Sequence, residues 1–167
     1  MDLLQPTPQD AVAPAPQGDL YLKFELGSGQ QLAFPATGVL EVVELPTENI
    51  TAMPNMHPLL MGTYNLRGEI LWLVDLALLF QNTYLTVANG QYPVIVVQDE
   101  DAPVGLAVAR ICGMSWLDGE RIQPVGQAPP ANLRPFVRGS FPQTDDDLAS
   151  VLLLDPDTLV RSRPWTQ

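Results

Sequence analysis

The sequence has little cysteine, few basic residues and no long apolar run, and each shortage narrows the classes of protein that fit it. A single cysteine, Cys112, excludes an internal disulfide, which fits a reducing compartment. No apolar run reaches the roughly 18 residues that a membrane-spanning helix needs. The first residues, MDLLQPTPQDAVAPAPQGD, have no basic segment of the kind that begins a secretory signal. We therefore expect a soluble, cytoplasmic protein with no direct membrane insertion.

Basic side chains are also scarce. The chain has 8 Lys and Arg against 19 Asp and Glu, so its formal net charge is −11. A negative surface repels phosphate backbones and anionic lipid headgroups, so we expect neither nucleic acid nor a membrane surface as a partner. The acidic excess is typical of a soluble surface and leaves a protein partner open.

Patterns of catalytic or metal-binding residues are missing from the sequence. The only histidine, His57, stands between Met56 and Pro58, with no nucleophile or further ligand at a suitable spacing. Cys112 lies within a strand pattern, which predicts a buried structural thiol. The acidic runs QDEDAP and QTDDDL lack the spacing of a calcium loop, and GSGQ lacks the spacing and the lysine of a phosphate loop. We predict no catalytic residue, no metal and no cofactor.

Proline separates a tail from a domain. Residues 1–18 hold Pro6, Pro8, Pro14 and Pro16 and almost no large apolar residue after Leu4, which predicts a disordered tail. Residues 19–167 are predicted to form one domain. Short strand patterns dominate this part of the chain, which favours a mostly-β, barrel-like or sandwich-like fold with short helical turns.

The first strand pattern is the clearest, because Leu20, Leu22, Phe24 and Leu26 alternate with other residues as in a half-buried strand. Further strands are predicted at 32–34, 42–45, 64–66, 69–76, 92–98, 102–110, 111–117, 136–141 and 148–155. Short helical turns are predicted at 55–62, 77–82 and 156–160, the last with Asp155 as its cap and Pro156 at its first position.

Arg67 has an unusual setting. It precedes Gly68 at a predicted hairpin turn, and apolar residues flank it on both sides. An exposed arginine beside apolar surface is a common anchor at protein interfaces. The alternative is a surface arginine in a weak ion pair.

The stretch around Arg67, GTYNLRGEILWLVDL, resembles the signature of CheW-like domains, the coupling proteins of bacterial chemosensory arrays. The resemblance covers residues 19–161, including YLKFELGSGQQLAFPATGVLEVVELP at the start and SVLLLDPDTLV at the end. The matching signature residues are Gly62, Asn65, Leu66, Arg67, Gly68, Asp75 and Leu76.

This resemblance implies a CheW-like fold of two small SH3-like β-barrel subdomains that share an apolar core, in a protein that is not an enzyme. It implies an adaptor in receptor arrays at the inner membrane. The adaptor couples the cytoplasmic helices of methyl-accepting receptors to the regulatory domain of a CheA-type histidine kinase, and so links receptor state to phosphotransfer, a two-component signal that controls motility.

Site residues follow from the same resemblance. In the family, the groove between the barrels meets the receptor helices, and the edge of one barrel meets the kinase. By position, the expected receptor-binding residues are Asn65, Leu66, Arg67, Gly68 and Val108. The expected kinase-binding residues are Val39, Val42, Glu44 and Leu45.

Some positions depart from the family pattern. Ala77 follows Asp-Leu where an arginine or lysine is common, and Ala109-Arg110 replaces an Asp-Gly-like pair. One alternative is therefore a divergent CheW-like adaptor of a type IV pilus or phototaxis pathway. Another, from a different class, is a small β-barrel enzyme, which requires titratable residues near His57 or Cys112.

Overall fold

The computed structural model describes residues 18–126, 129–142 and 150–166. The predicted disorder of residues 1–18 therefore lies outside the described residues, apart from Gly18. The whole acidic run QTDDDL, residues 143–148, is outside them too.

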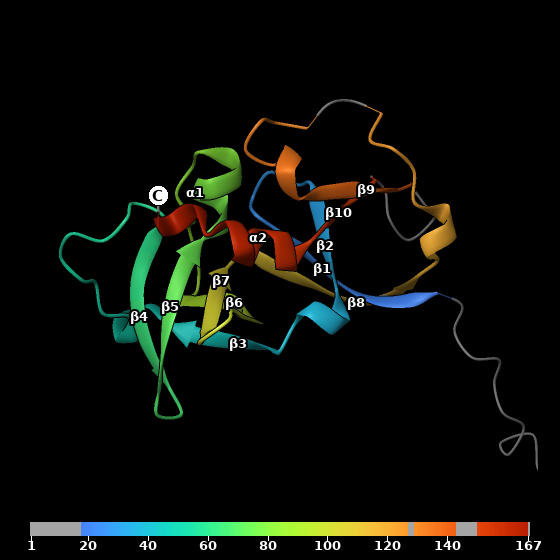
Figure 1. The fold of residues 1–167 in the computed structure, drawn as a ribbon. Helices are drawn as coiled ribbons and strands as arrows, with labels where there is room; N and C mark the ends of the chain where they lie inside the picture. The colour runs from blue at the N-terminus through green and yellow to red at the C-terminus, as the bar shows by residue number, and fades with distance from the viewer. Residues whose placement is uncertain (1–17, 127–128, 143–149, 167) are drawn as a thin grey trace, which may run out of the picture.

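Within the described residues, ten strands form two five-stranded sheets. Sheet A has the strand order β8-β1-β2-β10-β9 and contains β1 (Asp19–Glu25), β2 (Gln31–Pro35), β8 (Arg110–Leu117), β9 (Val137–Phe141) and β10 (Val151–Leu154). Sheet B has the order β3-β6-β7-β5-β4 and contains β3 (Glu41–Pro46), β4 (Leu60–Leu66), β5 (Glu69–Asp75), β6 (Gln91–Gln98) and β7 (Pro103–Ala107). Figure 1 shows the sheets side by side, with α2 (Pro156–Ser162) between them.

An isolated bridge between described residues closes each sheet. In sheet B, Thr51 follows the edge strand β3 and exchanges two hydrogen bonds of 2.9 Å with Thr63 in the opposite edge strand β4. In sheet A, Gln123 follows the edge strand β8 and exchanges two hydrogen bonds of 2.8 Å with Ser140 in the opposite edge strand β9. Each bridge joins the two edges of its sheet at one residue pair. The prediction of a mostly-β fold with two small barrels is confirmed.

One large apolar core joins the two barrels. It takes Phe24 and Phe34 from sheet A and Leu73 and Ile95 from sheet B, and all four are fully buried. A smaller core lies on the other face of sheet A and contains Tyr21, Ala33, Phe141, Val151 and Leu153. Strands β1, β2 and β10 are therefore buried on both faces, between the two cores.

This double burial corrects the prediction for the first strand. The alternation of residues 20–26 predicted one buried and one solvated face, but Tyr21 and Lys23 on the second face are buried as well. Tyr21 contacts Phe141 edge-on, with the ring centroids 5.1 Å apart. The sequence pattern missed this face because its partner, β9, lies more than a hundred residues further along the chain.

The helical turn predicted at 55–62 is wrong. Turns occupy this segment, and strand β4 begins at Leu60. Gly62 is a strand residue with φ +143°, and a Cβ there would lie 2.4 Å from the carbonyl oxygen of Thr51. The barrel-closing bridge thus requires glycine at this position of the signature.

Five 3-10 turns and two short helices connect the strands in the described part of the chain. The 3-10 turns are η1 (Ala36–Gly38), η2 (Thr47–Asn49), η3 (Gly119–Arg121), η4 (Arg134–Phe136) and η5 (Pro164–Thr166). The helices α1 (Leu76–Gln81) and α2 confirm the helical turns predicted at 77–82 and 156–160, and Asp155 caps α2 as expected. In the parts of the chain that are described, neither helix has the length and apolarity needed to cross a bilayer.

Asp75 of the signature has a structural role at the start of α1. Its carboxylate is buried and accepts hydrogen bonds from the backbone N–H of Leu78 at 2.9 Å and of Leu85 at 3.0 Å. The first bond caps the helix, and the second fixes the loop that follows it.

Asp75→Ala should destabilise the protein by about 3 kcal/mol. The change removes a helix cap and also leaves the buried N–H of Leu85 without its acceptor. Urea unfolding measures the difference. Asp118→Ala is the matched control, because Asp118 caps only the 3-10 turn η3, by one bond to Glu120; it should cost about 1 kcal/mol. Equal losses would contradict the role assigned to the Leu85 bond.

Candidate functional site

The Asn-Leu-Arg-Gly motif forms the two-residue turn of the β4–β5 hairpin. Leu66 pairs with Glu69 across the turn, and both central residues have positive φ, +51° at Arg67 and +89° at Gly68. This is the backbone pattern of a type I′ turn. The side-chain oxygen of Asn65 accepts a hydrogen bond of 2.8 Å from the N–H of Gly68. Asn65 and Gly68 thus build the turn, which presents the Arg67 side chain to solvent.

Arg67 pairs with Glu41 of β3. The guanidinium donates a hydrogen bond to the Glu41 carboxylate, and both side chains remain partly open to water. The surface ion pair that the sequence left open as an alternative is therefore present. It joins the hairpin tip to the edge strand on the other side of sheet B.

The ion pair shifts the titration of both partners. The hydrogen bond from Arg67 lowers the pKa of Glu41 below its ordinary value of 4.5, and the same bond raises the pKa of Arg67. Since the folded pKa of Glu41 is lowered, the contribution of the pair is complete above the ordinary pKa and is lost as the pH falls through the lowered one.

Arg67→Ala should raise the pKa of Glu41 to its ordinary range without unfolding the protein. The pair is exposed, so its loss removes a local charge interaction and little stability. NMR titration of the Glu41 side-chain carboxyl carbon measures this pKa. An unchanged Glu41 pKa in the variant would show that the two side chains do not pair in solution.

Strand β3 presents only part of the predicted kinase site. Successive residues of a strand face opposite sides, and here Val42 (40% exposed) and Glu44 face outward. Leu45 is 2% exposed and lies in the large core, so the expectation that its side chain meets a partner is corrected. Val39 is half-buried and packs against the same core. Leu40, which the prediction omitted, is exposed beside them.

A groove of about 460 Å³ lies between the barrels. Sheet B supplies Glu44 and Pro93 to it, and Arg110 and Ile111 come from β8 of sheet A. Val108 does not line the groove. Its side chain is fully buried, and its N–H donates a hydrogen bond of 3.0 Å to the carbonyl oxygen of Pro93. Val108 therefore fixes one wall against the other, and the expectation of direct partner contact is corrected.

Sequence reasoning missed the exposed apolar residues of β8. Met114 and Trp116 are 51% and 52% exposed and lie opposite Leu22 and Leu20 of β1. A bulge at Cys112, between the pairs Lys23–Gly113 and Phe24–Ile111, changes the phase of this strand. The residues before and after the bulge therefore do not follow one alternation, and the sequence pattern gave no signal for the exposed pair.

Two polar residues considered for chemistry have local partners. Cys112 is partly exposed rather than buried, and its Sγ lies 3.4 Å from a carboxylate oxygen of Glu25, which also pairs with Arg110. The Nδ1 of His57 accepts a hydrogen bond of 3.1 Å from the N–H of Leu59. Among the residues that the structure covers, no three His, Cys, Asp or Glu side chains gather as metal ligands would.

The fold and these surfaces define a class of protein: a two-barrel β module with an inter-barrel groove and with exposed apolar side chains on β3 and β8. The chain belongs to the family of CheW-like domains, whose family model matches residues 20–163. The resemblance seen in the sequence is thereby confirmed.

A solved structure agrees with this assignment. The chain is similar to the crystal structure of the scaffolding protein TtCheW from Thermoanaerobacter tengcongensis, with a TM-score of 0.67 and 22% sequence identity. The similarity covers 83% of this chain and 89% of TtCheW. At this identity the likeness establishes the fold. No curated protein matches the sequence.

Proposed function

We propose that this protein is a non-enzymatic adaptor of a chemosensory pathway, which couples the cytoplasmic helices of receptors to the regulatory domain of a CheA-type histidine kinase. Membership of the CheW-like family carries the proposal. The proposed role belongs in the cytoplasm, at receptor arrays on the inner membrane.

The inter-barrel groove is the proposed receptor site. A helical hairpin can lay an apolar face into a groove of this kind. The β8 strand supports this use, since it supplies Ile111 to the groove and carries Met114 and Trp116 further along. Tryptophan and methionine are enriched at protein interfaces. Leu66 and Arg67 on the hairpin tip add a second contact, with Asn65 and Gly68 holding its shape.

Strand β3 is the proposed kinase site. Leu40, Val42 and Glu44 are its exposed residues, and Glu44 stands where β3 borders the inter-barrel groove. The apolar pair offers area to bury, and Glu44 offers a charge that selects a basic partner. Modest affinity at each site is sufficient, because an array of many copies multiplies weak contacts.

Titration of the protein against the regulatory domain of its cognate kinase tests the β3 site. Glu44→Lys should weaken binding about tenfold, which corresponds to about 1.4 kcal/mol. Glu48→Lys is the matched control, because Glu48 is equally an exposed glutamate and lies just beyond β3 in η2. It should leave the affinity unchanged. Equal affinity of all three proteins would remove Glu44 from the interface.

A further inference from the structure

A second hollow surface shares no lining residue with the inter-barrel groove. It consists of two adjoining cavities of about 650 and 700 Å³, which have Asn82, Ala131 and Asn132 in common. One cavity extends over the β1–β2 turn, along Leu26 and Leu32. The other extends toward His57 and Pro164. Together they form an elongated cleft beside α1, which we call the α1 cleft.

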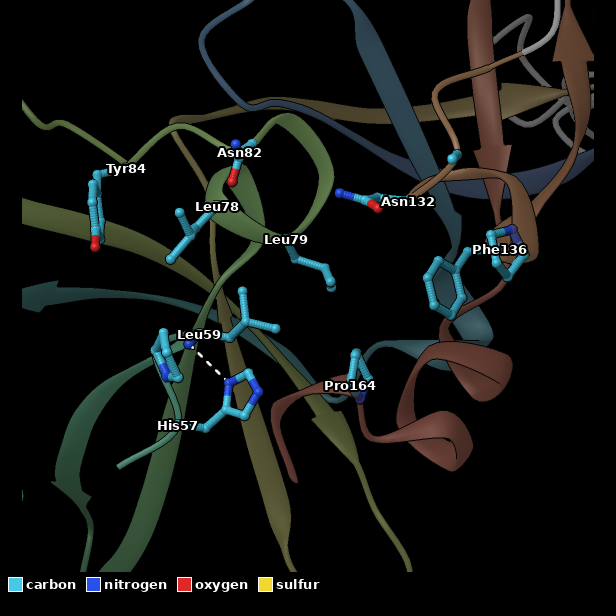
Figure 2. A pocket seen from close by; sticks show the side chains of 12 residues that line it. His57, Leu59, Leu78, Leu79, Asn82, Tyr84, Asn132, Phe136 and Pro164 are labelled. Atoms are coloured by element: carbon cyan, nitrogen blue, oxygen red, sulfur yellow. Dashed lines mark hydrogen bonds between the residues drawn. The ribbon is translucent and has the colours of Figure 1, made fainter. Parts of the chain in front are cut away.

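The walls of the α1 cleft combine apolar side chains with neutral amides and hydroxyls such as Gln30, Gln81 and Thr83. Leu59, Leu79 and Phe136 line one half, and Figure 2 shows their side chains at the cavity. Leu133 and Leu152 line the other half. No Asp, Glu, Lys or Arg lines either cavity, although the protein has a net charge of −11. Such a surface favours an uncharged occupant that has both apolar side chains and hydrogen-bonding groups.

The polar groups of the α1 cleft suit an extended peptide backbone. Asn82 follows α1 and Asn132 lies on the facing loop, so their amides enter the cavity from different segments (Figure 2). Each side-chain amide can donate and accept, as a peptide group does. His57 uses Nδ1 as an acceptor for the N–H of Leu59, so in the neutral ring Nε2 carries the proton and is a donor.

We propose that the α1 cleft binds the N-terminal segment of this same chain, residues 1–9. This segment, MDLLQPTPQ, contains an apolar pair, Leu3-Leu4, followed by Pro6 and Pro8. Its one charged side chain is Asp2, so it matches the uncharged walls. A proline-containing segment is restricted to extended conformations, which lowers the entropy cost of lying in a cleft.

The chain has enough length to reach the cleft. Strand β1 begins at Asp19 and leads to Leu26, which lines the cleft. Its seven residues span about 23 Å. Residues 10–17 cover about 25 Å in an extended polyproline-like form, which is close to the end-to-end length of β1. Attachment to the domain gives the segment an effective concentration in the millimolar range, so a weak contact suffices.

Paramagnetic NMR on the full chain tests the proposal. A nitroxide is attached to Thr7→Cys in a Cys112→Ser background, and each amide signal is compared before and after reduction of the label. The proposal predicts that Leu78, Asn82 and Asn132 lose most of their intensity, whereas Arg67 and Gly68 do not, because the β4–β5 turn lies at the end of β5 opposite to α1. Leu3→Ser with Leu4→Ser should restore these signals, because it removes the apolar anchor. Ala13→Ser with Ala15→Ser is the matched control and should leave the loss unchanged.

Three results would overturn the proposal: no loss of intensity at the cleft, a loss centred on another surface, or a loss that persists in the Leu3→Ser and Leu4→Ser variant. A second experiment mixes isotope-labelled protein with unlabelled protein that bears the nitroxide, and it can give a fourth contradicting result. If the cleft signals weaken in that mixture, a second copy supplies the segment and the intramolecular assignment is wrong. None of these outcomes depends on receptor or kinase binding, so the test is separate from that of the proposed function.

Discussion

Arg67→Glu should reduce the affinity for receptor helices by about ten- to a hundredfold and leave the fold intact. The change reverses an exposed charge at the tip of the β4–β5 hairpin and places it against Glu41. Repulsion between the two carboxylates releases the tip from β3, and the proposed contact loses its cation. Interface arginines that anchor a partner commonly cost this much when removed. Calorimetric titration with a soluble receptor fragment measures the affinity, and thermal unfolding checks the fold.

A charge-swapped variant separates direct contact from positioning. Arg67→Glu with Glu41→Arg restores an ion pair between the same two strands but leaves an acid at the hairpin tip. If Arg67 contacts the receptor, affinity stays low in the swapped protein. Recovery of affinity in the swapped protein would mean that Arg67 acts by positioning β3 through the ion pair. Unfolding of the Arg67→Glu variant would mean that Arg67 mainly stabilises the fold.

Gly62→Ala should destabilise the protein by about 3 kcal/mol or more, a large part of the 5–15 kcal/mol that stabilises a typical domain. The added Cβ would lie 2.4 Å from a backbone oxygen of Thr51, and φ is +143°. Either the residue is strained or the Thr51–Thr63 bridge opens, and with it the closure of sheet B. The midpoint of urea unfolding measures the effect.

Gly68→Ala is the matched control for this prediction. Gly68 also has positive φ, +89°, but a Cβ there would meet nothing within 4 Å. Only backbone strain applies, so the loss should be about 1 kcal/mol. If the two substitutions cost the same, contact with Thr51 is not what demands glycine at position 62.

The turn of the signature motif was predictable from the sequence because its determinants are local. A glycine after Arg67, between two strand patterns, indicates a tight hairpin, and the structure has a two-residue turn there. The start of α2 was predictable for the same reason, because Asp155 caps the first turn of the helix and Pro156 is its first residue. These residues act on neighbours a few positions away, which is the range that a sequence pattern records.

Long-range contacts determine what the sequence did not reveal. The second face of β1 is buried by Phe141, and Gly62 is required by Thr51 across a barrel closure. In β3, the run Val42-Val43-Glu44-Leu45 does not show which apolar residues face inward, so Leu45 was placed on the surface although it is buried. In β8, the bulge at Cys112 breaks the alternation of inward and outward residues, so the sequence pattern did not predict that Met114 and Trp116 are exposed.

Simultaneous binding of both partners tests the coupling role most directly. The receptor is proposed to bind in the inter-barrel groove and at the hairpin tip, and the kinase on β3. Analytical ultracentrifugation of this protein with a receptor helix fragment and a CheA-type regulatory domain should therefore show one complex that contains all three. Displacement of one partner by the other, or failure of either to bind, would contradict the proposal that this protein bridges them.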